Sequence, residues 1–503
     1  MTNNYQKLLE FFKEQNILQS MNSLLFFDMN TGIPRAGIPF RTEQFSWIQK
    51  ELHTRWSSPE LNDLIQKSKK SENNEEQIRI IELIERRYKL SNAIPSELSM
   101  KLAKQSNKTL EIWKDAKVKK DYSIVKNDLE ELFKLNMEKS ESFSKLFNIS
   151  DPYEALINTQ EPGFTVKIIE DLFNQTKQFL VPFLEKIITQ EQPNVTFTSR
   201  KVPRAVQELL VRDLAKYFQY DIDSPQSVGR IDEVEHPLTI PCGPQDVRIT
   251  VKYKDDDFLR SFMAGAHEIG HALHSLGARE EWRMHPLGRA FGPSFGESQS
   301  RFIENHIVRS EEFWKGYFPD FQNYTGDIFS DKTANDFYRA LNIVQNGVSR
   351  LGADELTYII HIIIRFEIEK DLFSGKASIS DLPSLWNQKY EDYLKVEIPD
   401  DAAGVMQDLH WYSQYWGYFF GYGIGDIIAG QIRFALEKDI PDWLTFIQEK
   451  NFIPIKQWQI DNIYAKGAMF DTLDLVKAIS GENLTTKHYI TYIEKKYKKI
   501  YQI

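Results

Sequence analysis

The chain has 503 residues, of which 41% are hydrophobic and 27% charged, and its net charge is −10. This composition is typical of a globular protein with a large core, and because Lys and Arg are dispersed rather than gathered in a basic stripe, nucleic acid is excluded as an expected partner. Cys242 is the only cysteine, which excludes internal disulfides and cysteine-rich zinc sites, and no uncharged apolar run reaches the ~20 residues that cross a bilayer.

The first residues, Met-Thr-Asn-Asn-Tyr-Gln-Lys, do not combine a charged segment with an apolar run, so we expect no secretory signal. A single cysteine suits a reducing compartment. We therefore expect a cytoplasmic protein that does not bind membranes.

Helical patterns fill the first half of the chain. Polar and charged runs separate apolar positions over residues 5–147, and more helical pattern follows over residues 151–225. Breaks occur at Glu161-Pro-Gly and at Glu191-Gln-Pro193. No Gly/Ser-rich or Pro-rich linker and no repeat of fixed period divides the chain. We predict a single domain over residues 1–503.

One clear strand is predicted over residues 246–253. Val247, Ile249 and Val251 alternate there with Arg248 and Thr250, which is strand periodicity with β-branched residues on the apolar face. Such a strand either offers a backbone edge to an extended peptide or is a half-buried strand with a solvated polar face.

The next helix contains two histidines four residues apart, His267 and His271. Residues at i and i+4 lie on one face of a helix, so both imidazoles reach one metal ion. Glu268 places a carboxylate beside that ion, as a general base needs in order to take a proton from bound water. The pattern predicts a zinc-dependent hydrolase, and its alternative is an amphipathic helix with surface histidines.

The local sequence supports a helix at this position. Apolar residues recur at helical spacing on a face that excludes the histidines, at Leu259, Phe262, Met263, Ala266 and Leu273. The acidic residues 255–257 suit the start of the helix, and Gly277 suits its end. We interpret His274, three residues after His271, as a packing residue rather than a ligand.

Catalytic zinc usually has three protein ligands and one open position, so two histidines need a third partner. Glu297 follows His271 by 26 residues and begins another helix. On spacing alone, Glu304, Asp354 and Glu355 are equally acceptable.

Two later segments are interpreted as structural. The run Ile359-Ile-His361-Ile-Ile-Ile364 is typical of a buried helix within a longer apolar helix over residues 353–373. The C-terminal lysines are expected to form a solvated helix face. They are Lys495, Lys496, Lys498 and Lys499.

Several blocks follow one another in a recognisable order. They are residues 24–34, His236-Pro237-Leu238, Asp246-Val-Arg248-Ile-Thr250, His267 to His271, Glu297-Ser298-Gln299, Arg350-Leu-Gly-Ala353-Asp354, residues 404–411 and residues 416–422. Together they resemble the carboxypeptidase Taq family of zinc metallocarboxypeptidases over roughly residues 24–425.

The resemblance implies a mainly α fold in which long helices form two lobes around a deep active-site groove, with a small β-sheet at the groove wall. It implies one Zn²⁺ per chain, with Co²⁺ as a possible substitute, and a homodimer. The implied reaction removes single amino acids from peptides with a free C-terminus.

The resemblance also assigns the site residues. His267, His271 and Glu297 become the metal ligands, and Glu268 becomes the acid and base. The substrate-binding residues are implied to be Arg350, Arg248 and His410 for the terminal carboxylate, and Tyr418 and Tyr422 as donors to the developing oxyanion. Gln407 and Asp408 are expected to orient His410 and nearby backbone.

Both arginines have alternative interpretations. A guanidinium binds a carboxylate through two parallel hydrogen bonds, and Arg350 stands at the end of an element where a groove exposes it. Arg350 can equally bond backbone carbonyls at a helix end. Arg248 can equally pair with Asp246 on the polar face of its strand.

The chain departs from the family pattern at several positions. Gly296 stands where His is common, and Leu238 replaces Phe. Ser349, before Arg350, stands where Ile or Asn is usual, and Phe420-Gly421 stands in the aromatic segment where Pro and a small polar residue are familiar. None removes a ligand or the base, so the departures bear on the shape of the groove. Two other functions stay open: a zinc endopeptidase or oligopeptidase, and a peptide-binding relative without turnover.

Overall fold

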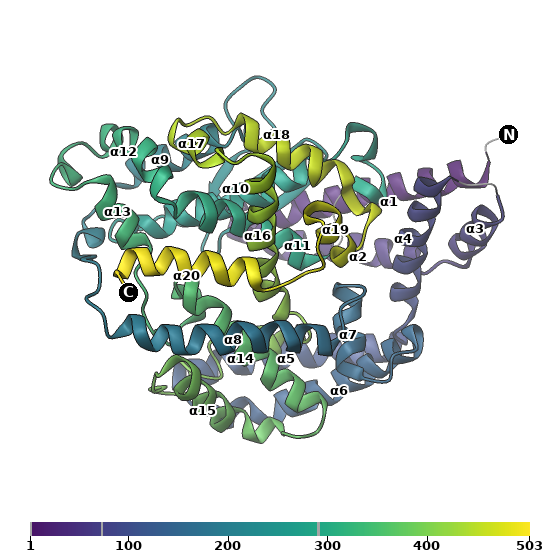
Figure 1. The fold of residues 1–503 in the computed structure, drawn as a ribbon. Coiled ribbons are helices and arrows are strands. Elements are labelled where there is room, and N and C mark those ends of the chain that lie inside the picture. The colour runs from purple at the N-terminus through teal and green to yellow at the C-terminus, as the bar shows by residue number, and fades with distance from the viewer. Residues whose placement is uncertain (1–2, 72–73, 289–291) are drawn as a thin grey trace.

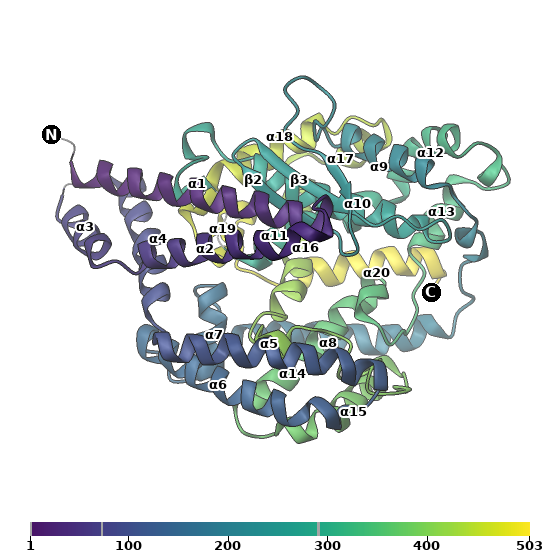
Figure 2. The same ribbon diagram turned by 180° about the vertical axis from the view of Figure 1, so that it is seen from behind.

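The computed structural model describes residues 3–71, 74–288 and 292–503. Within these residues the chain forms twenty α-helices and one three-stranded sheet. Two groups of helices lie one above the other (Figure 1), and the sheet belongs to the upper group (Figure 2). The prediction of a mainly α fold with a small sheet is confirmed.

The lower group combines segments from two distant parts of the chain (Figure 1). It consists of α5 (Ser96–Lys119), α6 (Ser123–Phe147), α7 (Pro152–Gln160), α8 (Val166–Ile188), α14 (Glu355–Phe373) and α15 (Leu382–Leu394). Helix α14 packs against α7, α8, α15 and α16, and its residues 355–366 are all buried, which confirms the predicted buried helix around His361.

The upper group holds most of the remaining helices. They are α9 (Arg204–Tyr217), α10 (Phe258–Leu276), α11 (Pro293–Arg301), α12 (Glu311–Thr325), α13 (Ala334–Leu341), α16 (Phe420–Asp439), α17 (Trp443–Gln448), α18 (Ile453–Asn462), α19 (Thr472–Ser480) and α20 (Lys487–Tyr501). At the N-terminus, α1 (Asn4–Thr31) and α2 (Ile38–Trp56) run side by side past the sheet, followed by α3 (Pro59–Lys69) and α4 (Glu75–Asn92) (Figure 2).

Side-chain caps fix the starts of many helices. The capping residue accepts a hydrogen bond from a backbone N–H of the first turn, which satisfies a donor that has no partner inside the helix. Such caps are Asn3, Ser58, Asn74, Asp151, Thr165, Ser310, Thr333 and Asp354.

The sheet contains more than the one predicted strand. Its strands β1 (Ile231–Glu233), β2 (Leu238–Gly243) and β3 (Asp246–Val251) have the order β1-β3-β2, with β1 parallel and β2 antiparallel to β3. Because β3 is paired on both sides, the expectation that it offers an edge to a peptide is wrong. The edge nearest the histidine helix belongs to β2, which packs against α10.

The C-terminal helix α20 packs on α16 and α8. The expectation that its lysines form a solvated face is wrong for Lys496, which is buried and donates to Glu355 Oε2 at 2.5 Å. No helix among the described residues is long and apolar enough to span a membrane.

Candidate active site

Helix α10 carries both candidate histidines. It begins after Asp257 and ends at Gly277, as the sequence predicts. Its apolar residues face α9, α11 and β3, and this packing leaves His267 and His271 on another face. The predicted packing role of His274 agrees with its ring contacts, since its centroid lies 5.6 Å from that of Tyr464.

The structure brings His267, His271 and Glu297 together. His267 Nε2 lies 3.9 Å from Glu297 Oε1, and His271 Nε2 lies 3.7 Å from Glu297 Oε2. One donor atom from each residue lies within 4.8 Å of the others. A tetrahedral zinc ion with bonds of about 2.0–2.2 Å separates its ligands by about 3.3–3.6 Å. The two imidazoles and one carboxylate therefore fit a divalent ion with one coordination position left open.

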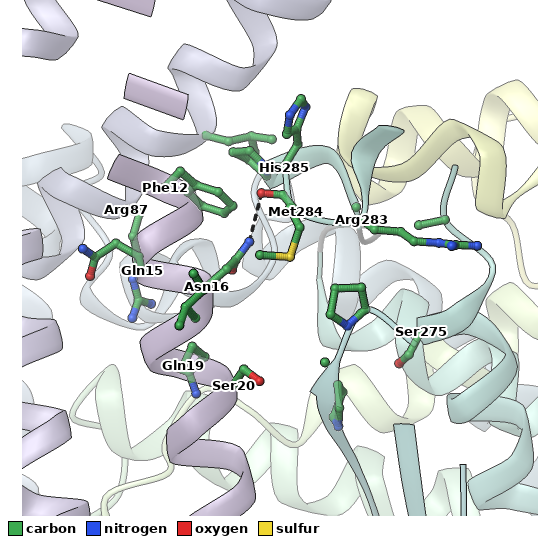
Figure 3. A pocket seen from close by; sticks show the side chains of 18 of the residues that line it. Phe12, Gln15, Asn16, Gln19, Ser20, Arg87, Ser275, Arg283, Met284 and His285 are labelled. Atoms are coloured by element: carbon green, nitrogen blue, oxygen red, sulfur yellow. Dashed lines mark hydrogen bonds between the residues drawn. The ribbon is translucent and has the colours of Figure 1, made fainter. Parts of the chain in front are cut away.

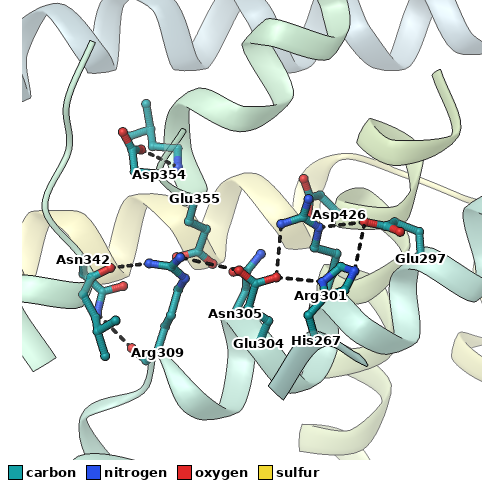
Figure 4. Close-up of polar contacts among 12 residues, drawn as sticks. His267, Glu297, Arg301, Glu304, Asn305, Arg309, Asn342, Asp354, Glu355 and Asp426 are labelled. Carbon is teal, nitrogen blue, oxygen red and sulfur yellow. Dashed lines mark hydrogen bonds and ion pairs between the residues drawn. The ribbon is translucent and has the colours of Figure 1, made fainter. Parts of the chain in front are cut away.

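Glu304 contacts the other side of His267. It lies in a π-helical segment, Phe302–Val308, that continues α11, and its Oε2 is 2.9 Å from His267 Nδ1. A carboxylate on Nδ1 leaves Nε2 to bind metal and holds the imidazole in one orientation. The other acidic candidates, Asp354 and Glu355, lie away from His267 (Figure 4). Asp354 caps α14, and Glu355 pairs with Lys496.

Arg301 links the acidic groups, and sequence reasoning missed it. Its Nε donates to Glu297 Oε1 at 3.0 Å, and its Nη1 donates to Glu304 Oε2 at 3.3 Å (Figure 4). Arg301 follows Glu297 by four residues in a helix, the spacing at which oppositely charged side chains pair, so the Glu297–Arg301 contact could have been predicted from the sequence. Since Arg301 holds Oε1, Glu297 Oε2 is the oxygen free to approach an ion.

The protonation of the cluster is uneven. Burial opposes the charge on His267, but Glu297 and Glu304 outweigh it and raise the pKa of His267 to about 9. Burial and the charge on His267 lower the pKa of His271 to about 3. Burial likewise opposes the charge on Glu297, yet His267 and Arg301 lower the pKa of this carboxyl. Glu297 and Glu304 thus favour positive charge at His267, and a divalent ion bound there in place of the proton would supply it.

Glu268 is held by strand β2. Thr239 Oγ1 lies 2.6 Å from Glu268 Oε2 and 3.0 Å from the Glu268 carbonyl oxygen, so its hydroxyl donates into this pair of acceptors. Burial raises the pKa of the Glu268 carboxyl, opposed mainly by the charge of His267. A buried carboxylate with one oxygen anchored has the other available for proton transfer. Thr239 was not identified from the sequence, because its partner lies 29 residues away.

Two glycines let the backbones around the site approach closely. A Cβ on Gly270, between the two histidines, would lie 2.5 Å from Ser300 Cα and 2.8 Å from the Gln299 carbonyl oxygen. A Cβ on Gly425 of α16 would lie 2.9 Å from Glu297 Cβ. Close contact at these points, with backbone at Gly270 and with the Glu297 side chain at Gly425, therefore sets the separation of α10, α11 and α16.

Arg350 is buried in a short 3₁₀ turn before α14. Its Nη2 and Nε donate to Asp408 Oδ1 at 2.8 and 3.1 Å, and the fully buried Arg365 donates its Nε to Asp408 Oδ2 at 2.7 Å. Gln407 accepts from the Arg350 backbone N–H and from Arg365. The expectation that Gln407 orients nearby backbone is confirmed, because its side chain also donates to the carbonyl oxygens of Val348 and Ala403; in addition, Gln407 and Asp408 hold the two arginines, which was not expected. Because Asp408 carries one negative charge and Arg350 and Arg365 carry two positive charges, this group of three side chains has a net positive charge.

Aromatic residues surround this charge. His410 lies 6.2 Å from Tyr418 and 6.3 Å from Tyr422 between ring centroids, and the Arg350 guanidinium lies 5.4 Å from the Tyr422 ring. Burial lowers the pKa of His410 to about 4, so its imidazole is neutral at pH 7. Burial, with a smaller contribution from the Glu297 carboxylate, raises the pKa of both phenols, which stay protonated donors.

Arg248 lies apart from this group. Its guanidinium makes two hydrogen bonds of 2.8 Å to Asp246, the alternative considered from the sequence, and lies over the Phe27 ring at 4.7 Å. Arg248 and Ile240 are paired across the strands, and Ile240 packs with Phe27 of α1. Arg248 therefore lies on the face of the sheet opposite to Thr239, whose neighbour is Glu268.

Gly296, one residue before the third candidate ligand, departs from the family pattern. The three candidate ligands still come together in its presence. A Cβ at this position would meet nothing within 4 Å. There is therefore open space beside residue 296.

A cavity of about 690 Å³ lies beyond the end of α10 (Figure 3). Asn16, Gln19 and Ser20 of α1 line one wall, and Pro241 of β2 and Ser275 of α10 line another. The Asn16 carboxamide donates to the Met284 carbonyl oxygen at 3.1 Å, which joins α1 to the loop after α10 (Figure 3). Sequence reasoning did not anticipate this cavity, since its walls come from distant segments.

The similarity to known proteins extends over nearly the whole chain. The model of the carboxypeptidase Taq (M32) metallopeptidase family matches residues 7–497. The chain is 32% identical to carboxypeptidase 1 of Bacillus subtilis (strain 168), with 95% of each chain covered, and 32% identical to thermostable carboxypeptidase 1 of Thermus thermophilus, with 99% of each covered. The crystal structure of an M32 carboxypeptidase from Deinococcus radiodurans R1 has a TM-score of 0.96 and 29% identity, covering 99% of this chain and 100% of that one.

Proposed function

Since the chain belongs to the carboxypeptidase Taq (M32) metallopeptidase family, we propose that it removes single amino acids from the C-terminus of peptides at a zinc site formed by His267, His271 and Glu297. The observation that carries the proposal is the convergence of these three donors beside Glu268. Two histidines and a glutamate are a common ligand set of catalytic zinc. We propose one ion per chain, with Co²⁺ as a substitute.

Each residue has a separate part in the proposed reaction. A divalent ion at this site lowers the pKa of a bound water and polarises the scissile carbonyl. Glu268 takes the proton of the attacking water and later delivers it to the leaving amine, while Thr239 holds the second oxygen of its carboxylate. His410, Tyr418 and Tyr422 are our candidate donors to the oxyanion, because each stays in its neutral, donating form at pH 7.

Recognition of a free C-terminus needs a fixed cation. Arg350 is our candidate, since Asp408, which Arg365 holds in place, fixes its guanidinium, and its Nη1 has only a 3.5 Å contact with the Tyr358 hydroxyl. The net positive charge of this buried group attracts a carboxylate in a medium of low dielectric. We do not include Arg248 in the carboxylate site, because Asp246 occupies its donors.

Matched peptides test the proposal. We expect a short peptide with a free C-terminus to be cleaved one residue at a time, and its C-terminal amide to resist cleavage. Equal cleavage of both would favour the endopeptidase alternative. Glu268→Gln should bind metal as the wild type does and lose turnover. If the wild type and this variant are equally inert with metal bound, the protein is a peptide-binding relative without turnover.

We further propose that residues 1–503 act as one catalytic unit, as a homodimer in the cytoplasm. The apolar core supports the first part, because one cluster of buried side chains includes residues from α5 through α20, and a second cluster joins residues of the first four helices to Trp282, Leu287 and Ala468. Light scattering on the purified chain measures the oligomeric state, and a monomeric mass would overturn the dimer.

A further inference from the structure

We propose that Glu369 is a positioning residue, which fixes the segment that carries the candidate oxyanion donors, residues 410–422. This inference rests on the proposed function and adds to it a side chain outside the candidate ligands, base and donors. Glu369 lies near the end of α14 and is fully buried. A buried carboxylate needs hydrogen-bond donors, and the origin of its donors shows which parts of the chain it holds together.

The Glu369 carboxylate binds both ends of one turn. Trp411 Nε1 donates to Glu369 Oε1 at 2.7 Å, and the Gly417 backbone N–H donates to Glu369 Oε2 at 3.0 Å. Trp411 directly follows His410, and Gly417 directly precedes Tyr418. Because both bonds end on one planar carboxylate, they fix the spacing between the two ends of the turn, and with it the spacing between His410 and Tyr418.

The backbone of this turn is irregular and depends on such contacts. It contains one short 3₁₀ segment, Trp411–Ser413, and Gln414 and Gly417 have φ values of +63° and +67°. A residue other than glycine is uncommon at positive φ and is kept there by its surroundings. A Cβ on Gly417 would lie 3.0 Å from Leu156 Cβ, so this end of the turn also lies close against α7.

Ring packing extends the effect to the side chain of His410. The His410 centroid lies 4.4 Å from that of Phe419, and the Trp411 ring stacks on Trp416 with centroids 5.4 Å apart. Among the described residues, the buried Nδ1 atom of His410 has no hydrogen-bond partner. The orientation of this imidazole therefore depends on the packing of the turn that Glu369 holds.

A third donor to Glu369 comes from outside the turn. The buried Tyr153 of α7 donates its hydroxyl to Glu369 Oε2 at 2.8 Å. A carboxylate can accept all three bonds, whereas an amide has one acceptor oxygen and presents its NH₂ group to at least one of the donors. Glu369→Gln therefore disturbs the turn, and Tyr153→Phe removes a bond to the same carboxylate while both contacts with the turn remain.

The test compares these two variants on a peptide with a free C-terminus. Burial raises the pKa of Glu369 to about 7, so assays at pH 8 compare the ionised carboxylate with the amide. Glu369→Gln should lower kcat about tenfold or more, because misplaced donors stabilise the transition state less. Its KM and metal content should stay near wild type. Tyr153→Phe should lower the thermal midpoint and leave kcat near wild type.

A second background separates positioning from general damage. In the double variant His410→Ala with Tyr418→Phe, the groups that Glu369 positions are absent. Adding Glu369→Gln to this background should lower kcat much less than it does in the wild type, because residues that act as a unit are not additive. A purely structural effect lowers kcat by the same factor in both backgrounds.

Three results would overturn the inference: wild-type kcat in Glu369→Gln, an equal loss of kcat in Tyr153→Phe, or the same loss in both backgrounds. If Glu369→Gln does not fold, Trp411→Phe, which removes the donor to Oε1, replaces it in every comparison. A wild type that leaves the peptide intact would instead refute the proposed carboxypeptidase function. A loss of kcat confined to Glu369→Gln, and smaller in the second background, supports the positioning role.

Discussion

At the scale of single residues, the hydroxyl of Thr239 anchors one oxygen of Glu268 and leaves the other to exchange protons. We expect Thr239→Val, which keeps the shape and removes the donor, to lower kcat about tenfold or more, since a hydrogen bond to a charged group contributes about 1.5–3 kcal/mol. KM and metal content should stay near wild type. Thr239→Ser restores the donor and should recover most of kcat. A Val variant with wild-type kcat would show that Glu268 needs no anchor.

Substitution of Arg350 tests its proposed role in binding the C-terminal carboxylate of the substrate. We expect Arg350→Ala to lower kcat/KM for free-acid peptides about 100-fold or more with metal content unchanged, because a buried charge-assisted bidentate contact is lost. Arg350→Lys should not restore the rate, since an ammonium lacks the planar fork. Arg248→Ala is the control. If it lowers kcat/KM as much as Arg350→Ala does, Arg248 also belongs to the carboxylate site.

At the scale of elements, the start of α11 is capped by a residue from a distant segment. Gly292 precedes the helix with a φ of +101°, and a Cβ there would clash with the Glu161 carboxylate, which occupies the place of a capping side chain. Glu161 Oε1 accepts from the Ser294 backbone N–H at 2.6 Å, and Oε2 accepts from the Thr472 hydroxyl at 2.7 Å. The helix that carries Glu297 is thereby tied to residues 161 and 472.

This cap makes stability depend on pH. Burial raises the pKa of Glu161 from 4.5 to about 7, so the folded chain binds the proton more tightly than the unfolded chain. The contribution of this proton to stability is complete below about pH 4.5 and is lost as the pH rises through about 7. The free energy of unfolding of the wild type, relative to Glu161→Gln, should fall by up to about 3 kcal/mol across this range. Denaturation at pH 5 and pH 8 measures this difference, and a constant value would contradict it.

The elements differ in how far they could be predicted. Helix α10 was predicted nearly to the residue, because its apolar positions, acidic start and terminal glycine all lie within the segment. Strand β2 was missed because Pro241 and Gly243 interrupt any alternation, and β1 because it has only three residues. The family resemblance supplied the candidate roles of Glu297 and Arg350. The pairing of Arg350 with Asp408 was not predicted, since Asp408 lies 58 residues away and no local sequence pattern indicates such a contact.

At the scale of the whole molecule, the C-terminal helix is fastened to the core by a buried ion pair. Lys496 and Glu355 are both buried, and burial lowers the pKa of Lys496 to about 8. We expect Lys496→Met to destabilise the chain by about 3–5 kcal/mol, because Glu355 is left as an uncompensated buried charge. The double variant with Glu355→Leu should recover most of this loss.

An exposed pair on the same helix is the control. Lys499 pairs with Glu311 at the surface, so Lys499→Met should change stability by less than about 1 kcal/mol. Thermal and urea midpoints of all four proteins make the comparison. If the two lysine substitutions destabilise the chain equally, burial of the Lys496–Glu355 pair does not increase its contribution to stability.

The contact at Gly270 has a consequence for the choice of ion. At Gly270 the backbones of α10 and α11 are in direct contact, so no side chain at this point can repack to change the separation of the two helices. A single added methyl group at residue 270 would act as a spacer, pushing Glu297 away from both imidazoles and making the site fit larger cations. We therefore expect the metal preference of this chain to depend on residue 270 as well as on the three proposed ligands.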